Sequence, residues 1–191
     1  VSGLVIDYYA GTCVIQCHTS GIYAYRQMIA EALKNAMGTQ LKAIYDKSSE
    51  TLHGAVPDAM NEFLYGIQEE NIVLENGHQF RVDFTTGQKT GFFIDQRDNR
   101  QLVGQYAKGK SVLNTFAYTG GFSVYALMNG ATQVDSVDVS KNAIELLNEN
   151  MGLNDAKATN HMGLAADTFS YFKTLEKQYD IVILDPPAFA K

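Results

Sequence analysis

Four short segments in the second half of the chain place acidic residues, glycine or proline directly after apolar runs. In the first, residues 112–122, the run leads into Gly120-Gly121, where the missing Cβ lets the backbone pack closely against a ligand. Phe116 and Tyr118 break the pattern G-x-G-x-x-G, so a pyrophosphate would be poorly cradled. The loop could instead offer amides and carbonyls to a zwitterionic methionine group, or be an ordinary strand-to-helix connection. Its candidate cofactor-binding residues are Asn114, Phe116, Tyr118 and Gly120.

The second segment, residues 134–140, reaches its acidic residue, Asp138, at the end of an apolar run. A carboxylate in this place can accept hydrogen bonds from both hydroxyls of an adenosine ribose. The alternative is a solvated strand-end residue, since Ser140 is the better N-cap for the next helix. Because a glycine turn precedes it, we favour the ribose role for Asp138.

The third and fourth segments contain Asp167 and the run Asp185-Pro186-Pro187. Asp167 could bond the amino group of an adenine, or it could equally be a helix N-cap or first-turn acid. A carboxylate before two residues of fixed φ makes a rigid turn, which suits holding a flat base beside a methyl donor. Asp185 and Pro186 are therefore the catalytic candidates and Asp185 is also a cofactor candidate, while Pro187 and Phe189 are substrate-binding candidates.

Residues 87–100 add cationic and aromatic side chains ahead of these segments. Lys89 and Arg97 offer donors and are substrate-binding candidates, while Phe92 and Phe93 offer flat surfaces. The alternative is that both phenylalanines belong to the core and that the charges of residues 95–100 form a solvated helix face. The sequence leaves the two interpretations open.

The elements that must position these residues follow an alternating pattern from residue 86 to residue 191. Strands are expected at residues 111–116, 133–139, 156–161 (weakly) and 179–184, and helices at 94–106, 122–128, 141–151 and 167–175. This alternation predicts an α/β domain with a parallel, doubly wound, Rossmann-like sheet. Ligands of such sheets bind beyond the carboxyl ends of the strands, so all four segments should meet there.

Residues 1–85 predict a different, small α+β domain with β-hairpins. Expected strands are residues 4–8, 12–18, 42–45, 72–75 and 79–84, with a helix over 22–37 and a loop over 48–61. Asn76-Gly77 is the strongest short hairpin signal in the sequence.

Composition excludes several classes of protein. No apolar run approaches the roughly 20 residues that cross a bilayer, and the first residues lack the features of a signal peptide. Nothing suggests a disulfide framework, so a cytoplasmic protein is the default. Four scattered histidines predict no metal site. Cys13 and Cys17 would lie roughly 13 Å apart on one strand, too far for a disulfide, and are expected in the core. The net charge of −6 argues against a self-sufficient RNA clamp.

Taken in order, the four segments resemble the class I S-adenosylmethionine (SAM)-dependent methyltransferases. More narrowly, residues 87–100 and Gly3-Leu4-Val5-Ile6-Asp7 resemble the PUA-containing family that methylates carbon 5 of cytosine in 23S ribosomal RNA. The resemblance covers almost the whole chain and implies SAM as cofactor and ribosomal RNA as partner. It also implies a PUA RNA-binding domain before Val1 and a nucleophilic cysteine beyond Lys191, whose thiolate would add to C6 of a flipped-out base. We therefore expect a fragment, cut after the fourth strand of its sheet, that binds the cofactor weakly or not at all and is inactive alone.

Other functions stay open. Asp-Pro-Pro is also compatible with an amino-directed methyltransferase of nucleic acid or protein. A non-catalytic nucleotide-binding module or an NAD oxidoreductase is a further alternative, and binding of SAM or NAD separates these classes. The sequence also leaves the oligomeric state open, a homodimer included.

Overall fold

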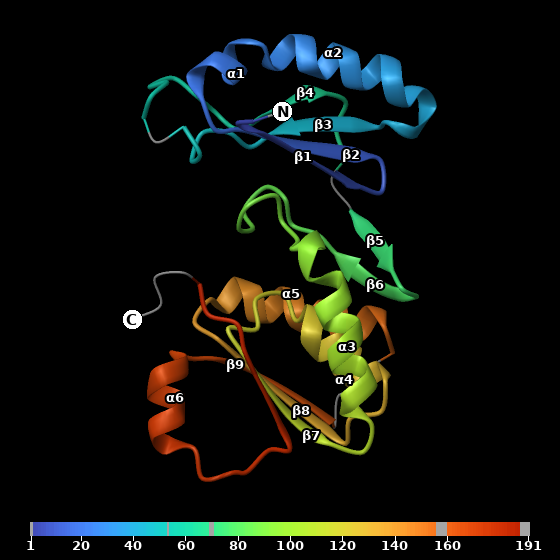
Figure 1. Ribbon diagram of the computed structural model, residues 1–191, viewed down its shortest axis with the longest axis vertical. Helices are drawn as coiled ribbons and strands as arrows, with labels where there is room; N and C mark the ends of the chain where they lie inside the picture. The colour runs from blue at the N-terminus through green and yellow to red at the C-terminus, as the bar shows by residue number, and fades with distance from the viewer. Residues whose placement is uncertain (1, 53, 69–70, 156–159, 188–191) are drawn as a thin grey trace. The chain divides into compact units, whose positions relative to one another are not determined.

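The computed structural model describes residues 2–52, 54–68, 71–155 and 160–187 (Figure 1). Its contacts divide the chain into two compact units. Unit 1 consists of Val1–Val73 and Val82–Phe92, and unit 2 of Leu74–Arg81 and Phe93–Lys191. The chain thus passes into unit 2 at Leu74, returns to unit 1 at Val82 and enters unit 2 again at Phe93, whereas the sequence suggests one boundary near residue 85. The division into domains 1–85 and 86–191 stays a prediction.

Unit 1 contains a four-stranded sheet in the order β1-β2-β3-β4. β1 and β2 form an antiparallel hairpin, β2 and β3 are parallel, and β3 and β4 are antiparallel. Helices α1 and α2 and the 3-10 helix η1 connect β2 to β3. The bounds are β1 Leu4–Tyr9, β2 Thr12–Cys17, α1 Ser20–Ala24, α2 Arg26–Met37, η1 Gly38–Gln40, β3 Ala43–Asp46 and β4 Glu62–Tyr65.

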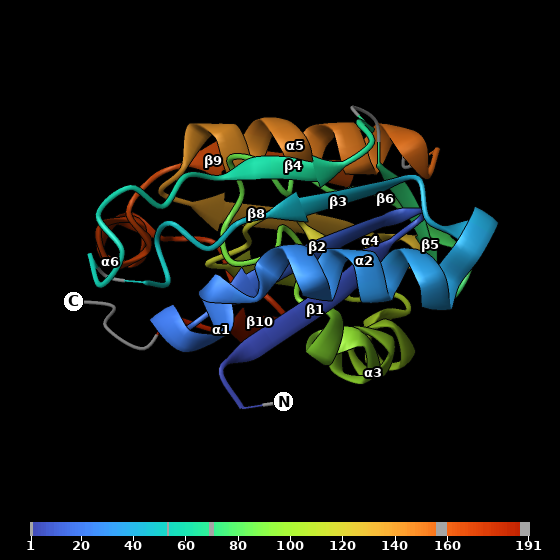
Figure 2. The ribbon, with the colours of Figure 1, turned by 90° about the horizontal axis from the view of Figure 1, so that it is seen from above.

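The two faces of this sheet carry different cores. α2 lies across one face, where Ala30 packs with Cys13, Ile15 and Ile44 (Figures 1 and 2). Tyr45 points to the opposite face, since side chains alternate along a strand, and its ring contacts those of Phe63 and Phe84. Cys13 and Cys17 are both buried and unbridged, which confirms that they are core residues.

Two expectations for unit 1 were incomplete. The single helix expected over residues 22–37 is interrupted at Tyr25, whose backbone has φ −97° and ψ 7°. Strand β4 was not expected at all. It pairs with β3 in a register that shifts between Ile44 and Tyr45.

Unit 2 contains the parallel sheet that the alternating pattern predicts. Its strand order is β10-β7-β8-β9, and every neighbouring pair is parallel. The chain thus passes from β7 outward to β9 and returns to the other side of β7 with β10, which places the topological switch point next to β7. The bounds are η2 Ile94–Gln96, α3 Arg97–Ala107, β7 Ser111–Thr115, α4 Gly121–Met128, β8 Gln133–Asp138, α5 Lys141–Leu153, β9 His161–Ala165, α6 Thr168–Thr174 and β10 Ile181–Leu184.

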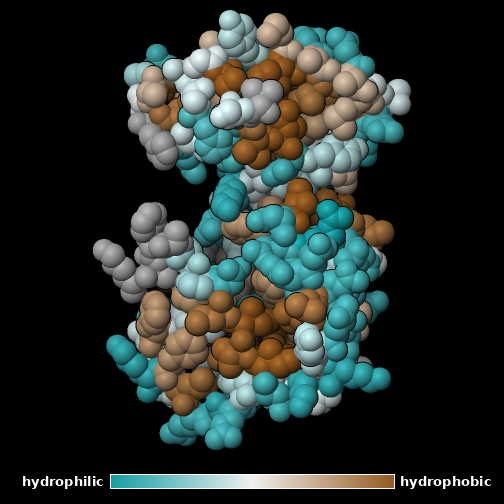
Figure 3. Space-filling view, in the orientation of Figure 1, coloured by the Kyte–Doolittle hydropathy of each residue, from teal (hydrophilic) through white to brown (hydrophobic). Residues whose placement is uncertain are grey.

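The core of unit 2 joins three strands to two helices. Val112, Val134 and Ile183 pack with Ala107 of α3 and Ala126 of α4. On the opposite face, Val182 and Leu184 of β10 stay 54% and 59% exposed. Figure 3 shows apolar side chains gathered on one side of this unit.

The third strand of this sheet lies further along the chain than expected. The weak strand was placed at residues 156–161, whereas β9 begins at His161 and pairs with β8 from Val134↔His161 to Asp138↔Ala165. Residues 156–159 lie outside the described part of the chain.

A separate two-stranded hairpin consists of β5 (Ile72–Glu75) and β6 (His78–Arg81). Its turn has positive φ at Asn76 (50°) and Gly77 (87°), which confirms the Asn-Gly hairpin. In the part of the chain that the model describes, no helix combines the length and the apolar character needed to span a bilayer.

Candidate functional site

The register of the parallel sheet brings the ends of its strands to one edge. Leu184 and Val137 both pair with Thr115, and Asp138 pairs with Ala165. Because the strands are parallel, Asp185, Asp138 and the loop that follows Thr115 all leave the sheet at its carboxyl edge. The structure therefore brings the predicted segments to the same side of the sheet.

The loop between β7 and α4 has an unusual backbone. Phe116 and Tyr118 adopt φ of 53° and 47°, and Gly120 adopts φ of 79°. Left-handed conformations of bulky residues are costly and gather at functional sites. A Cβ on Gly120 would lie 2.5 Å from Cγ of Leu147, so this position requires glycine.

Asp138 ties the end of β8 to this loop. Its Oδ2 accepts the backbone N–H of Tyr118 at 2.8 Å, and its Oδ1 accepts that of Ser140 at 2.9 Å. The side chain is half-buried, and each carboxylate oxygen retains a second lone pair. A rigid, partly accessible acceptor of this kind fits a pair of ribose hydroxyls.

Exposed apolar side chains lie at the same end of the sheet as Asp138. Val139 is 76% exposed, and Phe169 is 41% exposed with its ring centroid 6.0 Å from that of Phe116. Exposed apolar groups next to a carboxylate suit the flat face of a purine and its adjoining sugar. Val139 was not singled out as a site residue, although an apolar residue directly after Asp138 is a signal that the sequence does contain.

Asp167 serves as the N-cap of α6. Its carboxylate accepts the backbone N–H of Ser170 at 2.8 Å. Hydrogen bonding by the Ser170 side chain, together with this backbone bond, holds the pKa of Asp167 below its usual value. The structure thus shows the capping alternative, and contact with an adenine stays a prediction.

Asn114 is 1% exposed and donates to Ser123 Oγ at 2.8 Å, so its side chain supports α4 from inside the core.

The candidate catalytic and substrate-binding residues that the structure describes are exposed. Asp185, Pro186 and Pro187 are exposed beyond β10, and Phe189 lies outside the described residues. Lys89 is exposed in unit 1 with φ 48°, and Arg97 is exposed at the start of α3 in unit 2.

The phenylalanines of this segment differ. Phe92 is a core residue at 6% exposure, and its carbonyl accepts the Tyr9 hydroxyl at 3.0 Å, whereas Phe93 is half-buried with its ring 5.4 Å from that of Tyr118. The alternative of a solvated helix face over residues 95–100 does not hold for Arg100, which is 3% exposed. No group of three or more His, Cys, Asp or Glu side chains that could hold a metal occurs among the described residues.

Comparison with known proteins finds relatives along the whole chain. A candidate ribosomal RNA large subunit methyltransferase of Bacillus subtilis is 41% identical over 198 residues, which cover 100% of this chain and 49% of that protein. Ribosomal RNA large subunit methyltransferase I of Aeromonas salmonicida is 35% identical over 205 residues, 99% of this chain and 49% of its own length. The chain thus spans about half the length of the curated relatives it matches.

A solved structure of a candidate methyltransferase in complex with S-adenosylhomocysteine (SAH) superposes with a TM-score of 0.87 and 33% identity, covering 99% of this chain and 49% of that one. The family model described as S-adenosylmethionine-dependent methyltransferase matches residues 7–191. With the parallel sheet and its acidic carboxyl edge, this match shows that the chain belongs to the family of S-adenosylmethionine-dependent methyltransferases.

Proposed function

We propose that the protein binds SAM at the carboxyl edge of its parallel sheet and methylates large-subunit ribosomal RNA, at carbon 5 of a cytosine. The observation that carries the cofactor proposal is Asp138, held by the amides of Tyr118 and Ser140 beside a left-handed glycine loop. The names of the relatives, which are ribosomal RNA methyltransferases, support the substrate. We place the protein in the cytoplasm because of this substrate.

When bound, the cofactor supplies an electrophilic methyl group. Different residues at the carboxyl edge hold its ribose, its adenine and its methionine group. Asp138 accepts the ribose hydroxyls, and Val139 and Phe169 flank the adenine. The backbone of residues 116–120 faces the methionine group, with Phe116, Tyr118 and Gly120 fixing its shape and Asn114 supporting it. The exposed carboxylate of Asp167 accepts the adenine amino group in addition to capping α6.

On the substrate side, Asp185 and Pro186 form the rigid turn that positions the base. We assign contacts with the flipped nucleotide to Pro187 and Phe189, and contacts with phosphates to Lys89 and Arg97. Methylation at carbon 5 requires a thiolate. Burial raises the pKa of Cys13 and of Cys17, so neither is suited to this role. We therefore propose that the nucleophilic cysteine lies outside residues 1–191.

Cofactor binding is tested by titrating the ¹⁵N-labelled chain with SAH, SAM and NAD and following the backbone amide signals. Weak binding is sufficient for this measurement, and we expect SAH and SAM to shift the amides of residues 116–121 and 138–140. Asp138→Asn should weaken binding at least about tenfold, because a hydrogen bond to a charged group contributes about 1.5–3 kcal/mol.

Asp180→Asn is the matched control. Asp180 also accepts a backbone N–H, that of Ser111, but it lies at the amino edge of the same sheet. NAD binding at residues 116–121, or an unchanged SAH affinity in Asp138→Asn, would overturn the cofactor proposal.

Substrate and position are tested with the natural polypeptide that carries this chain. It is incubated with large-subunit ribosomal RNA and isotope-labelled SAM, and the modified nucleoside is identified by mass spectrometry. We expect 5-methylcytidine. A methyl group on an exocyclic amine would support the amino-directed alternative and reject carbon-5 chemistry.

A further inference from the structure

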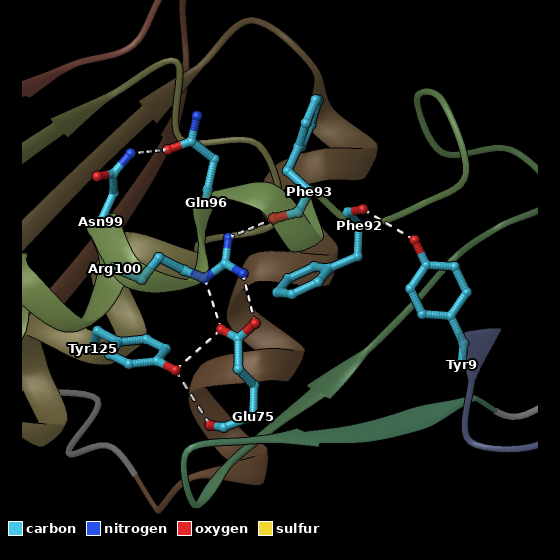
Figure 4. Close-up of polar contacts among 8 residues, drawn as sticks. All are labelled: Tyr9, Glu75, Phe92, Phe93, Gln96, Asn99, Arg100 and Tyr125. Carbon is cyan, nitrogen blue, oxygen red and sulfur yellow. Dashed lines mark hydrogen bonds and ion pairs between the residues drawn. The ribbon is translucent and has the colours of Figure 1, made fainter. Parts of the chain in front are cut away.

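A buried ion pair joins the β5–β6 hairpin to helix α3. The Arg100 guanidinium donates from Nε to Glu75 Oε1 at 2.8 Å and from Nη2 to Oε2 at 2.7 Å (Figure 4). The two side chains are only 3% and 10% exposed. Tyr125 of α4 donates its hydroxyl to Glu75 Oε1 at 3.0 Å. Glu75 therefore connects the hairpin to two helices of unit 2 through charge-assisted hydrogen bonds.

Arg100 also reaches the loop of residues 116–121. Its Nη1 donates to the carbonyl of Phe93 at 3.0 Å, and the Phe93 ring packs edge-on against Tyr118. The Tyr118 amide is the donor to Asp138. A Cβ on Gly121 would lie 2.8 Å from Cδ of Arg100, so glycine at this position makes room for the arginine stem.

Asn150 of α5 and Asn154, the C-cap of this helix, make a second, independent link from the hairpin to the same loop. Asn154 accepts the Gln79 N–H at 2.8 Å and donates to the Gln79 carbonyl at 2.7 Å, as a neighbouring strand would. Asn150 accepts the Arg81 N–H at 2.8 Å and donates to the Thr119 carbonyl at 2.9 Å. Asn150 is fully buried, so this connection is shielded from water.

We infer that Glu75, Arg100 and Asn150 are positioning residues that brace residues 116–121 in the shape that binds the cofactor. The hairpin lies outside the parallel sheet, yet two routes lead from it to adjacent residues of this loop. The route through Arg100 ends in the ring contact of Phe93 with Tyr118, and the route through Asn150 is hydrogen-bonded as far as the carbonyl of Thr119. The loop backbone is left-handed at Phe116, Tyr118 and Gly120, and such a conformation persists only where its surroundings impose it. This inference rests on the proposed SAM binding.

The brace is tested with three variants of the chain. Glu75→Gln with Arg100→Gln removes both buried charges together, and Asn150→Ala removes the second route. Phe93→Leu breaks the ring contact with Tyr118 and leaves the ion pair intact, so it keeps the test decisive if the charge variant fails to fold. SAH affinity is measured from amide shifts, well below the midpoint of thermal unfolding.

We expect each variant to weaken SAH binding about tenfold, because one or two loop residues that the brace no longer holds must then be ordered when the ligand binds. The Tyr118 amide signal should move even without ligand, because its hydrogen bond to Asp138 loosens. A purely structural role would lower the unfolding temperature but leave both measurements unchanged. Arg81→Met with Glu149→Gln is the matched control, since it removes a partly exposed ion pair between the same hairpin and α5. Its SAH affinity should stay within about twofold of the wild type.

The outcomes separate the two proposals. If the unaltered chain shows no SAH-induced shifts, the proposed function fails, whatever the variants do. If the unaltered chain binds SAH and folded Phe93→Leu and Asn150→Ala bind it equally well with an unmoved Tyr118 signal, the brace is rejected.

Discussion

Gly120 combines two constraints that no other residue type meets. Its φ of 79° is left-handed, and an added Cβ would lie within 2.5 Å of Leu147. Gly120→Ala should therefore lower the free energy of unfolding by about 2–4 kcal/mol, from the left-handed backbone and the overlap together. Urea denaturation followed by circular dichroism measures this change.

Gly152→Ala is the matched control at the residue scale. Gly152 lies in α5, and an added Cβ there meets nothing within 4 Å. Alanine is the better helix former, so this variant should be stabilised by about 0.5–1 kcal/mol. If Gly120→Ala unfolds at the same urea concentration as the wild type, the left-handed turn at Gly120 is wrong.

Single residues of the site differ in how far the sequence could reveal them. Asp138 follows from its place at a strand end, because a strand and its carboxyl edge are local patterns. Arg100 could not be found this way, since a charged residue on a short helix is ordinarily solvated. Its burial depends on Glu75, a partner from another element that no local pattern connects to it.

At the scale of elements, the connection between α6 and β10 is fastened to β8 by Asp135. This carboxylate is 2% exposed and accepts from Lys177 Nζ and Tyr179 Oη, both at 2.6 Å. Burial acts to raise the pKa of Asp135, but the hydrogen bonds from Lys177, Tyr179 and Gln133 outweigh burial and hold the pKa below its usual value.

A depressed folded-state pKa sets the direction of the pH dependence. The stabilisation by Asp135 is fully present above the unfolded-state value of about 3.9 and is lost as the pH falls through the lower folded-state value. Asp135→Asn should cost about 2 kcal/mol at pH 7. It should also flatten the decline in stability below about pH 4. Urea unfolding at a series of pH values tests both, with exposed Asp98→Asn as control. An unchanged acid profile in Asp135→Asn would contradict the assignment.

Most elements follow from periodicity, and the exceptions have physical reasons. β4 is four residues long, and the ring of its Phe63 packs against Tyr45 and Phe84, which come from elsewhere in unit 1. β9 reads His-Met-Gly-Leu-Ala, without a β-branched residue, and pairing with β8 makes it a strand. The apolar residues of α1 and α2 keep a helical spacing across the break at Tyr25, so the spacing alone cannot reveal that the helix is interrupted there.

At the scale of the whole molecule, the balance of charge limits what the chain can do with RNA. The sequence has 21 acidic and 15 basic residues, a net charge of −6. Long-range attraction to a polyanion is therefore absent, and binding has to come from a few local contacts. This balance is consistent with the expectation that residues 1–191 are inactive alone, which an assay of methyl transfer by this chain tests directly.

The salt dependence of RNA binding measures the number of those contacts. With Lys89 and Arg97 each neutralising one phosphate of a single strand, the logarithm of the affinity should fall against the logarithm of salt with a slope of about −1.4. Lys89→Gln should reduce the slope by about 0.7, because one contact is lost. Exposed Lys108, which follows α3, provides a control variant, Lys108→Gln, whose slope should match the wild type. Fluorescence anisotropy with a labelled ribosomal RNA oligonucleotide between about 50 and 200 mM salt gives these slopes. A wild-type slope steeper than about −4 would mean that a basic surface, and not Lys89 and Arg97 by themselves, holds the RNA.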